Sequence, residues 1–127
     1  MATFCIFRCN SLHFFIAKHT TITDAPSDST MSRTWFKRGI NDLQNLLDKK
    51  WLHQQQYYLG EWHFHPNGTP IPSQIDIQEM QRIAKNKNYN CPEPILIIAG
   101  NRNNKWELGI YIFFPNKSYT LISKAQL

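Results

Sequence analysis

The 127-residue sequence lacks several features that would place it in particular classes of protein. No stretch approaches the ~20 apolar residues that a transmembrane helix needs, because Arg8, Asn10 and His13 interrupt the apolar N-terminal region. That region also has no basic start followed by an apolar run and a small-residue cleavage site, so no secretory signal is predicted. The three cysteines are an odd number and do not suggest a disulfide framework. We therefore expect a cytoplasmic protein with no membrane partner.

Acidic residues are also scarce, with 9 Asp and Glu against 14 Lys and Arg, and the formal net charge is +5. A basic balance permits an acidic partner such as nucleic acid, but it does not select one. The lysines and arginines are scattered, so a solvated surface is the favoured interpretation and nucleic acid is an unfavoured partner. Hydrophobic residues make up 42% of the chain, which is enough for the core of a single domain over residues 1–127.

The pattern of apolar residues predicts a set of strands. β-Branched and aromatic residues gather in residues 3–8 and 12–22, which predicts a hairpin. The same enrichment predicts three further strands, at residues 94–100, 105–114 and 118–125. Gly and Asn in the segment GNRNN predict a tight turn between the first two of these three.

Two helices are predicted from apolar residues at three- and four-residue steps. The first is expected to start after an N-cap at Thr30 or Ser32. Its apolar stripe consists of Phe36, Ile40, Leu43, Leu47 and Trp51. The second is expected to begin at about Ser73, and its modest stripe consists of Ile75, Met80, Ile83 and Ala84. Together the elements predict an α/β (α+β) domain in which helices flank a mixed β-sheet.

Residues 60–76, GEWHFHPNGTPIPSQID, concentrate side chains that can do chemistry. Residues 55–65 read as a strand, in which alternate residues face the same side. Glu61, His63 and His65 therefore share one face. The aromatic residues Trp62 and Phe64 share the other face and are expected to enter the core. The residues that follow hold three prolines and a glycine, so the strand must end there.

His63 and His65 can reach one metal ion from the same strand face, and a third ligand must come from elsewhere. Asp76 lies in the first turn of the second predicted helix, and the loop before it is long enough to fold back against the histidines. A metal at this point would lower the pKa of a bound water to ~7. Ser73 could donate its hydroxyl to the developing oxyanion. On its own, Ser73 with Asp76 is also the pattern of a capping box.

The segment HFHPNGTPIPSQID resembles the His-x-His-Pro, spacer, Ser-x-x-Asp signature of JAMM (JAB/MPN) metalloproteases. The preceding YYLGEWHFHP is similar to the bacterial branch of that family. That branch includes deconjugating peptidases encoded beside ubiquitin-like conjugation machinery, some of them in anti-phage defence operons. The resemblance implies a cytidine-deaminase-like fold. It also implies Zn²⁺ held by His63, His65 and Asp76, with Ser73 as the catalytic residue that stabilises the oxyanion.

The resemblance further implies the reaction and the partners. It implies a deubiquitinase-like isopeptidase that cleaves after the C-terminus of a ubiquitin-like modifier, in a free fusion or a conjugate. E1/E2-like conjugation proteins are the further partners that the resemblance implies.

One residue of the family's catalytic set has no counterpart in this sequence. The family's general base is a glutamate on a strand far upstream of the histidines, whereas the first glutamate here is Glu61. If residues 3–8 match the family's apolar run, the missing glutamate would fall at or just before Met1. Three explanations stay open: a true N-terminus upstream of Met1 that carries the start of this strand, an inactive relative, or Glu61 in the role. The third is disfavoured, because Glu61 is displaced from His63 by about 6–7 Å along the strand and suits support of an imidazole better.

Two other functions remain as alternatives. A catalytically inactive MPN-type binding module would not cleave a modifier fusion. A small basic nucleic-acid-binding domain would bind DNA or RNA with a salt-dependent affinity that His63→Ala and His65→Ala leave unchanged. Cys5, Cys9 and Cys91 receive no role from the sequence, and cysteines packed as small hydrophobes are the favoured interpretation.

Overall fold

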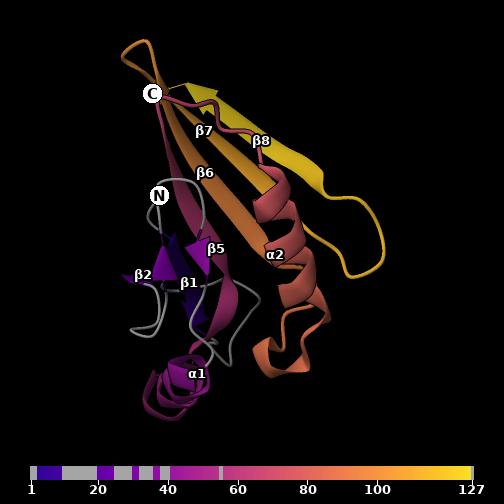
Figure 1. Cartoon of the computed structure of the whole chain (residues 1–127). Helices are drawn as coiled ribbons and strands as arrows, with labels where there is room; N and C mark the ends of the chain where they lie inside the picture. Colours follow the sequence, from indigo (N-terminus) through magenta and orange to yellow (C-terminus); the bar gives the residue numbers. More distant parts are fainter. Residues whose placement is uncertain are drawn as a thin grey trace.

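The computed structural model describes residues 3–9, 20–24, 30–31, 36–37, 41–54 and 56–126 (Figure 1). In these ranges, one sheet has six strands in the order β2-β1-β5-β6-β7-β8. Its strands are β1 (Thr3–Cys9), β2 (Thr20–Asp24), β5 (Gln56–Pro66), β6 (Ile95–Arg102), β7 (Lys105–Ile112) and β8 (Thr120–Gln126). Two short strands, β3 (Thr30–Met31) and β4 (Phe36–Lys37), pair with each other.

The sheet is mixed because β5 and β6 run parallel, while the other neighbouring strands run antiparallel. A parallel pair needs a crossover connection, and here the crossover contains α2 (Gln74–Lys85) and the short 3-10 helix η1 (Lys87–Tyr89). The other helix, α1 (Asn41–Gln54), precedes β5. The predicted fold class, an α+β domain with a mixed sheet flanked by helices, is confirmed. Neither described helix is both long and apolar enough to cross a membrane.

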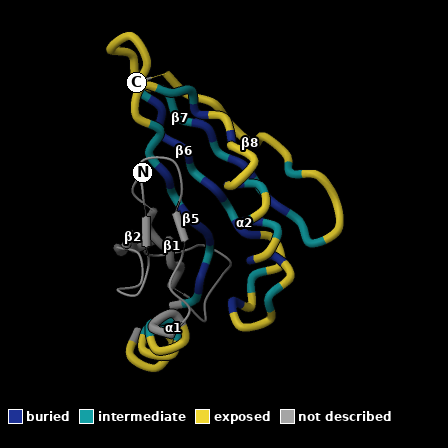
Figure 2. Tube along the Cα trace, in the orientation of Figure 1, coloured by how far each residue is buried: buried dark blue, intermediate teal, exposed yellow. Residues whose placement is uncertain are grey.

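The core lies between α2 and one face of the sheet, where dark blue segments of the chain meet in Figure 2. Met80 and Ile83 of α2 have no exposed surface and belong to the same cluster as Leu96 and Ile98 of β6. Burying a side chain of this size stabilises the fold by about 1.5–3 kcal/mol. The remaining members of the cluster are Tyr58, Tyr89, Tyr111 and Phe113.

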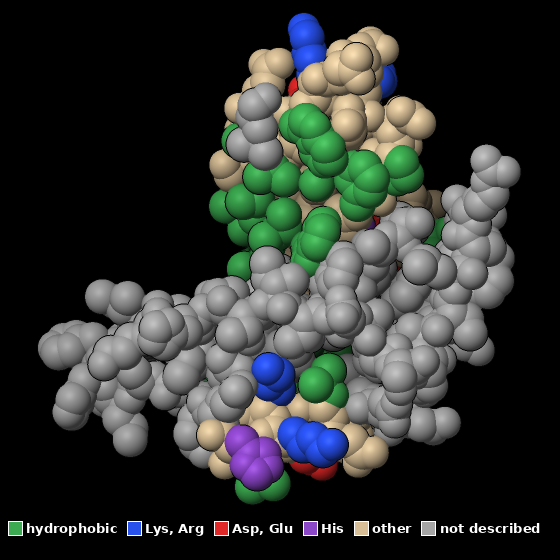
Figure 3. Space-filling model, turned by 90° about the vertical axis from the view of Figure 1, so that its left-hand side faces the viewer, with side chains coloured by type: hydrophobic (Ala, Val, Ile, Leu, Met, Phe, Trp, Pro, Cys, Tyr) green, Lys and Arg blue, Asp and Glu red, His purple; other side chains and the backbone are tan. Residues whose placement is uncertain are grey.

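The histidine face of β5, and not its aromatic face, is the one that α2 covers. His63 pairs in register with the core residue Ile98, whereas Trp62 and Phe64 are only half-buried. Phe64 stacks on the exposed Trp106 with ring centroids 5.4 Å apart. The expectation that these two aromatic residues enter the core was therefore wrong. Figure 3 shows hydrophobic side chains gathered over the strands in the upper half of one side of the molecule.

Several predicted boundaries also need correction. Residues 36–37 form β4, so the predicted helix begins later, at Asn41, and Thr30 is a strand residue of β3 rather than its N-cap. Ile75 of the second predicted stripe is exposed, because α2 turns Asp76 toward the core instead. β1 and β2 do pair antiparallel, but Arg8 pairs with Thr20, so the pairing does not follow from the predicted turn at residues 9–11. Cys9 of that turn is still a strand residue of β1, and residues 10–11 lie outside the described residues.

The β6–β7 hairpin follows the prediction closely. Arg102 pairs with Lys105, which leaves a two-residue loop of Asn103 and Asn104. Both asparagines have positive φ, at 53° and 58°. A type I′ turn needs such angles at both central positions, and its backbone twist matches the twist of the paired strands.

Candidate metal centre

β5 carries the two histidines on the core side of the sheet. His63 is 4% exposed and His65 is half-buried. The register against the parallel strand β6 pairs His63 with Ile98 and His65 with Gly100. Both imidazoles therefore lie near the end of β5, where the chain leaves the sheet.

The chain reverses direction directly after His65. Asn67 has a positive φ of 57°, and the Gly68 N–H donates to the His65 carbonyl oxygen at 3.1 Å. Pro66 has no N–H that could continue a strand ladder. A proline followed by a left-handed asparagine is typical of a type II turn. The turn ends β5 and sends the next loop back over the sheet.

The loop of residues 66–73 lies against two glycines of neighbouring strands. A Cβ at Gly100 would lie 2.6 Å from a backbone carbonyl oxygen of the loop, and a Cβ at Gly109 would lie 2.5 Å from the Pro70 carbonyl oxygen. Only glycine permits so close an approach of two backbones. The Tyr111 hydroxyl also donates a hydrogen bond to the Pro70 carbonyl. These contacts hold the loop down and return the start of α2 to the histidines.

A capping box fixes Asp76 at the start of α2. Ser73 is the N-cap, and its hydroxyl oxygen accepts a hydrogen bond from the Asp76 N–H at 3.2 Å. In return, Asp76 Oδ2 accepts hydrogen bonds from the Ser73 N–H and from the Ser73 hydroxyl, each at 2.7 Å. Reciprocal bonds of this kind satisfy two helix-end donors and hold both side chains in one orientation. The capping interpretation of Ser73 and Asp76 is therefore confirmed.

The same carboxylate lies between the two imidazoles. Asp76 Oδ1 is 2.6 Å from His63 Nδ1, and Asp76 Oδ2 is 3.3 Å from His65 Nε2. One ligand atom from each of these three residues lies within 4.8 Å of the others. Asp76 is 1% exposed, so its carboxylate forms the buried side of the cluster. Two imidazole nitrogens and one carboxylate oxygen are a donor set that zinc accepts.

The orientation of His65 is set by a backbone group. Its Nδ1 lies 3.1 Å from the Thr69 carbonyl oxygen, which can only accept a hydrogen bond. Nδ1 must therefore carry the proton, and Nε2 faces Asp76. Metal-binding histidines are commonly held in this way, with one nitrogen donating to a carbonyl and the other turned to the ion.

The electrostatics of the cluster follow from this packing. Burial alone would raise the pKa of Asp76, but hydrogen bonds from His63, His65 and Ser73 outweigh it and hold that pKa well below its usual range. The hydrogen bond to Asp76 raises the pKa of His65, although burial opposes the change. Asp76 is therefore a carboxylate at neutral pH, as a metal ligand must be.

Glu61 shares the histidine face but is not part of the cluster. It has no exposed surface, and the hydroxyl of the buried Tyr58 donates a hydrogen bond to its carboxylate. The N-terminal end of β1 does approach the cluster, because Thr3 pairs with His63 in the antiparallel register.

Sequence reasoning named all three clustered residues and the N-cap, but it missed the groups that position them. The Thr69 carbonyl gives no side-chain signal. Gly100 and Gly109 looked like ordinary strand residues. A glycine inside a strand pattern is itself a sign of close backbone approach, so these two could have been found.

A mixed sheet with a two-histidine strand, followed by a helix that returns a buried acid to it, defines the class of domain. The chain belongs to the prokaryotic homologs of the JAB domain, whose family model matches residues 7–109. The resemblance to the bacterial JAB branch is thereby confirmed.

Two curated relatives carry the name "CD-NTase/cGAS isopeptidase". The one from Enterobacter hormaechei subsp. hoffmannii (strain UCI 50) is 49% identical over 78 residues, which are 61% of this chain and 43% of the relative. The one from Escherichia coli (strain TW11681) is 35% identical over 92 residues, 68% of this chain and 54% of the relative. The chain thus spans about half the length of the curated relatives it matches.

Proposed function

We propose that this chain is a zinc-dependent isopeptidase that hydrolyses an amide bond in a protein conjugate. The observation that carries the proposal is the convergence of His63, His65 and Asp76 within 4.8 Å, on the core side of the sheet. Membership of the JAB family and two relatives named as isopeptidases support the same reaction class. The relatives' name supports a CD-NTase/cGAS conjugate as the substrate. The bond cut would be the amide bond after the C-terminus of the ubiquitin-like modifier.

The three side chains would hold the metal through one atom each. His65 offers Nε2, because its Nδ1 donates to the Thr69 carbonyl, and Asp76 is kept ionised by its hydrogen bonds. Zinc, when bound, supplies a Lewis acid that activates water and polarises the substrate carbonyl. The capping box keeps Asp76 in place before any metal arrives, so the site is preorganised.

Ser73 is the residue proposed to act on the substrate. Its side chain stands at the solvent side of the cluster, next to the buried Asp76. A hydroxyl in this position can donate to the oxyanion that develops on the attacked carbonyl. Its hydrogen bond to Asp76 gives the hydroxyl a fixed starting orientation.

The catalytic set also needs a general base. Glu61 is a poor candidate, since it is fully buried and bonded to Tyr58. A carboxylate on the N-terminal side of β1 is better placed, because Thr3 already pairs with His63. A second function follows if no such carboxylate exists: a zinc-containing binding module that holds the conjugate without cutting it. The observation that favours it is that Glu61, which lies on the histidine face, is fully buried and bonded to Tyr58 and so does not reach the cluster.

The test combines metal content with cleavage. The chain of residues 1–127, and the same chain continued upstream in frame, are assayed on a CD-NTase or ubiquitin-like modifier joined to a reporter protein by an amide bond. We expect about one zinc per chain in both proteins. Asp76→Asn should lose most of the zinc, while the exposed carboxylate variant Glu93→Gln should keep it.

Each outcome separates the candidates. Cleavage that depends on zinc and on Asp76 supports the isopeptidase. Stoichiometric zinc without cleavage by either protein supports the binding module. Failure of the wild-type chain to retain zinc at micromolar free metal overturns both.

A further inference from the structure

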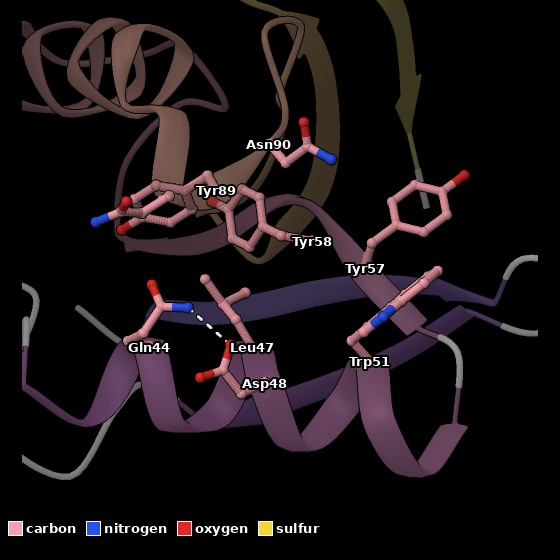
Figure 4. Close-up of a pocket in the computed structure, with 9 residues that line it drawn as sticks. Gln44, Leu47, Asp48, Trp51, Tyr57, Tyr58, Tyr89 and Asn90 are labelled. Carbon is pink, nitrogen blue, oxygen red and sulfur yellow. Dashed lines mark hydrogen bonds between the residues drawn. The ribbon is translucent and has the colours of Figure 1, made fainter.

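A second site lies at the opposite end of β5 from the metal cluster. An open pocket of about 480 Å³ is lined there by α1, by the first residues of β5 and by η1 and the residue after it (Figure 4). At about 3.3 Å per residue, Tyr58 is about 17 Å along the strand from His63. The pocket therefore shares no residue with the metal cluster and does not depend on it.

The walls of the pocket are mainly aromatic. Tyr58 and Tyr89 meet edge to face with ring centroids 4.7 Å apart, and both belong to the hydrophobic core. Trp51 and Tyr57 stand together at the other end of the pocket (Figure 4). Trp51 is 47% exposed, so its ring forms part of the mouth. The pocket thus has a buried aromatic floor and an accessible aromatic rim.

Among the described residues that line the pocket, Asp48 alone carries a formal charge at neutral pH. It is an exposed carboxylate of α1, and these described lining residues include no lysine or arginine. Its Oδ1 accepts a hydrogen bond from Gln44 Nε2 at 2.8 Å, one turn earlier on the helix. In the described part of the chain, no cation lies within ion-pair distance of Asp48. The carboxylate is therefore oriented but not neutralised.

We propose that this pocket binds an arginine side chain of a protein partner. The aliphatic stem of an arginine is apolar and can lie against the aromatic walls, and its planar guanidinium can stack on a ring such as that of Trp51. The fork of N–H donors then meets the Asp48 carboxylate, which it can engage through two hydrogen bonds. Lysine would offer a point charge without the planar face, so arginine is the better match.

Charge complementarity decides the class of ligand. An anionic ligand such as a phosphate or an acidic peptide would face the unneutralised Asp48 at the pocket. A neutral apolar side chain would fill the aromatic part and leave that carboxylate without a cation. A cation with an apolar stem satisfies both parts, although the chain as a whole has a net charge of +5. The pocket is thus locally acidic on a basic protein. A cation would be attracted by the Asp48 carboxylate itself and not by the charge of the whole chain.

The test uses a capped Gly-Arg-Gly tripeptide and a matched capped tripeptide with citrulline, which keeps the shape of arginine but lacks its charge. Binding is followed by NMR through the indole N–H of Trp51 and the backbone amides of the pocket. We expect saturable binding of the arginine peptide in the millimolar range and at least about tenfold weaker binding of the citrulline peptide. Asp48→Asn should weaken arginine binding about tenfold, and Trp51→Ala about two- to fivefold.

Two controls keep the result interpretable. Leu52→Ala changes a neighbouring α1 side chain that is 71% exposed and does not line the pocket, so binding should stay unchanged. His63→Ala alters the metal cluster and should also leave binding unchanged, so failure of the proposed hydrolysis and failure of this site remain distinguishable. Equal binding of the two peptides, or no saturable binding of either, overturns the proposal. Binding that survives Asp48→Asn in full overturns it as well.

Discussion

Tyr58 and Glu61 lie three residues apart on β5, yet the Tyr58 hydroxyl donates a hydrogen bond to the Glu61 carboxylate. In a regular strand, residues at this odd separation point to opposite faces. The register against β1 explains the exception, because Ile6 pairs with Gly60 and the next residue of β1 pairs with Tyr58. Leu59 therefore has no partner on β1 and forms a β-bulge. The side chains of β5 that precede the bulge point to the face opposite to the one that a regular strand would give them.

Because the bulge brings the Tyr58 hydroxyl to the Glu61 carboxylate, this hydrogen bond should contribute to the stability of the fold. Tyr58→Phe removes one donor from a carboxylate that has no exposed surface. Losing such a partner should lower the free energy of unfolding by about 1–3 kcal/mol. Urea denaturation of the two proteins measures the difference. The control is Tyr57→Phe, the half-buried neighbour, for which we expect a change within ~0.5 kcal/mol; equal losses in the two variants would contradict the prediction.

The contact between Gly100 and the loop of residues 66–73 supports a prediction about metal affinity. A Cβ at Gly100 would lie 2.6 Å from the Gly68 carbonyl oxygen, so Gly100→Ala must push the loop away from the sheet. The loop connects the histidines to Asp76, and overpacking of this kind costs about 1–3 kcal/mol. We therefore expect Gly100→Ala to lower both stability and zinc affinity, as calorimetric titration would show. At Gly68 itself a Cβ would meet His65 Cβ at 3.2 Å, so Gly68→Ala should be milder.

The candidate site could be predicted from the sequence because its ligands are local. His63 and His65 share a face through the two-residue period of a strand, and Asp76 follows within one loop and one helix turn. Gly100 and Gly109 could be recognised as points of close backbone approach, but the loop that they contact could not be predicted, because it comes from a distant part of the chain. Gly100 reaches the loop only through the parallel pairing of β5 with β6, and no local pattern reports that pairing.

The fold was predictable where one signal dominated. The turn at Asn103 and Asn104 has the chemistry that a type I′ hairpin needs, and the prediction held. The buried face of β5 was assigned wrongly, because Trp62 is more apolar than His63 and composition alone favours it for the core. What decided the face was α2, which brings Met80 and Asp76 onto the histidine side. A hydrophobic pattern shows that a strand is two-sided, but not which side another element will cover.

Cys91 should behave as an inert thiol. Burial raises the pKa of Cys91 to about 11, and its Sγ contacts the Leu59 carbonyl oxygen at 3.7 Å. Only the thiolate reacts with iodoacetamide, so alkylation of Cys91 at pH 7.5 should be at least about tenfold slower than that of free cysteine. The rate should rise as the pH approaches 11. Site-resolved mass spectrometry measures this position separately from Cys5 and Cys9, and fast labelling at pH 7.5 would contradict the prediction.

The pair of His65 and Asp76 predicts how the stability of the metal-free chain changes with pH. The pKa of His65 is raised in the folded state, so its contribution is complete below the unfolded value of about 6.5 and is lost as the pH rises through the folded value. The pKa of Asp76 is lowered, so its contribution is present above about 3.9 and is lost as the pH falls further. In the presence of a chelator, the melting temperature should therefore be higher at pH 5.5 than at pH 8.

Zinc should reverse this dependence of the melting temperature on pH, because protons compete with the metal for the imidazoles. The rise in melting temperature on adding zinc should grow between pH 5.5 and 7.5. Asp76→Asn should flatten both the metal-free and the zinc-dependent profiles. A zinc effect that is the same at the two pH values would show that the metal binds elsewhere on the chain.

Ser73 has a structural role and a proposed catalytic role, and two substitutions separate them. Ser73→Ala removes the N-cap acceptor of α2 and should cost about 0.5–2 kcal/mol, whereas glycine at an N-cap costs only a few tenths. Ser73→Gly should therefore fold and hold zinc much as the wild type does. If the hydroxyl donates to the oxyanion, kcat should still fall by about 10²–10³ in the form of the protein that cleaves the conjugate. Full turnover by Ser73→Gly would show that the hydroxyl serves only to cap α2 and to orient Asp76.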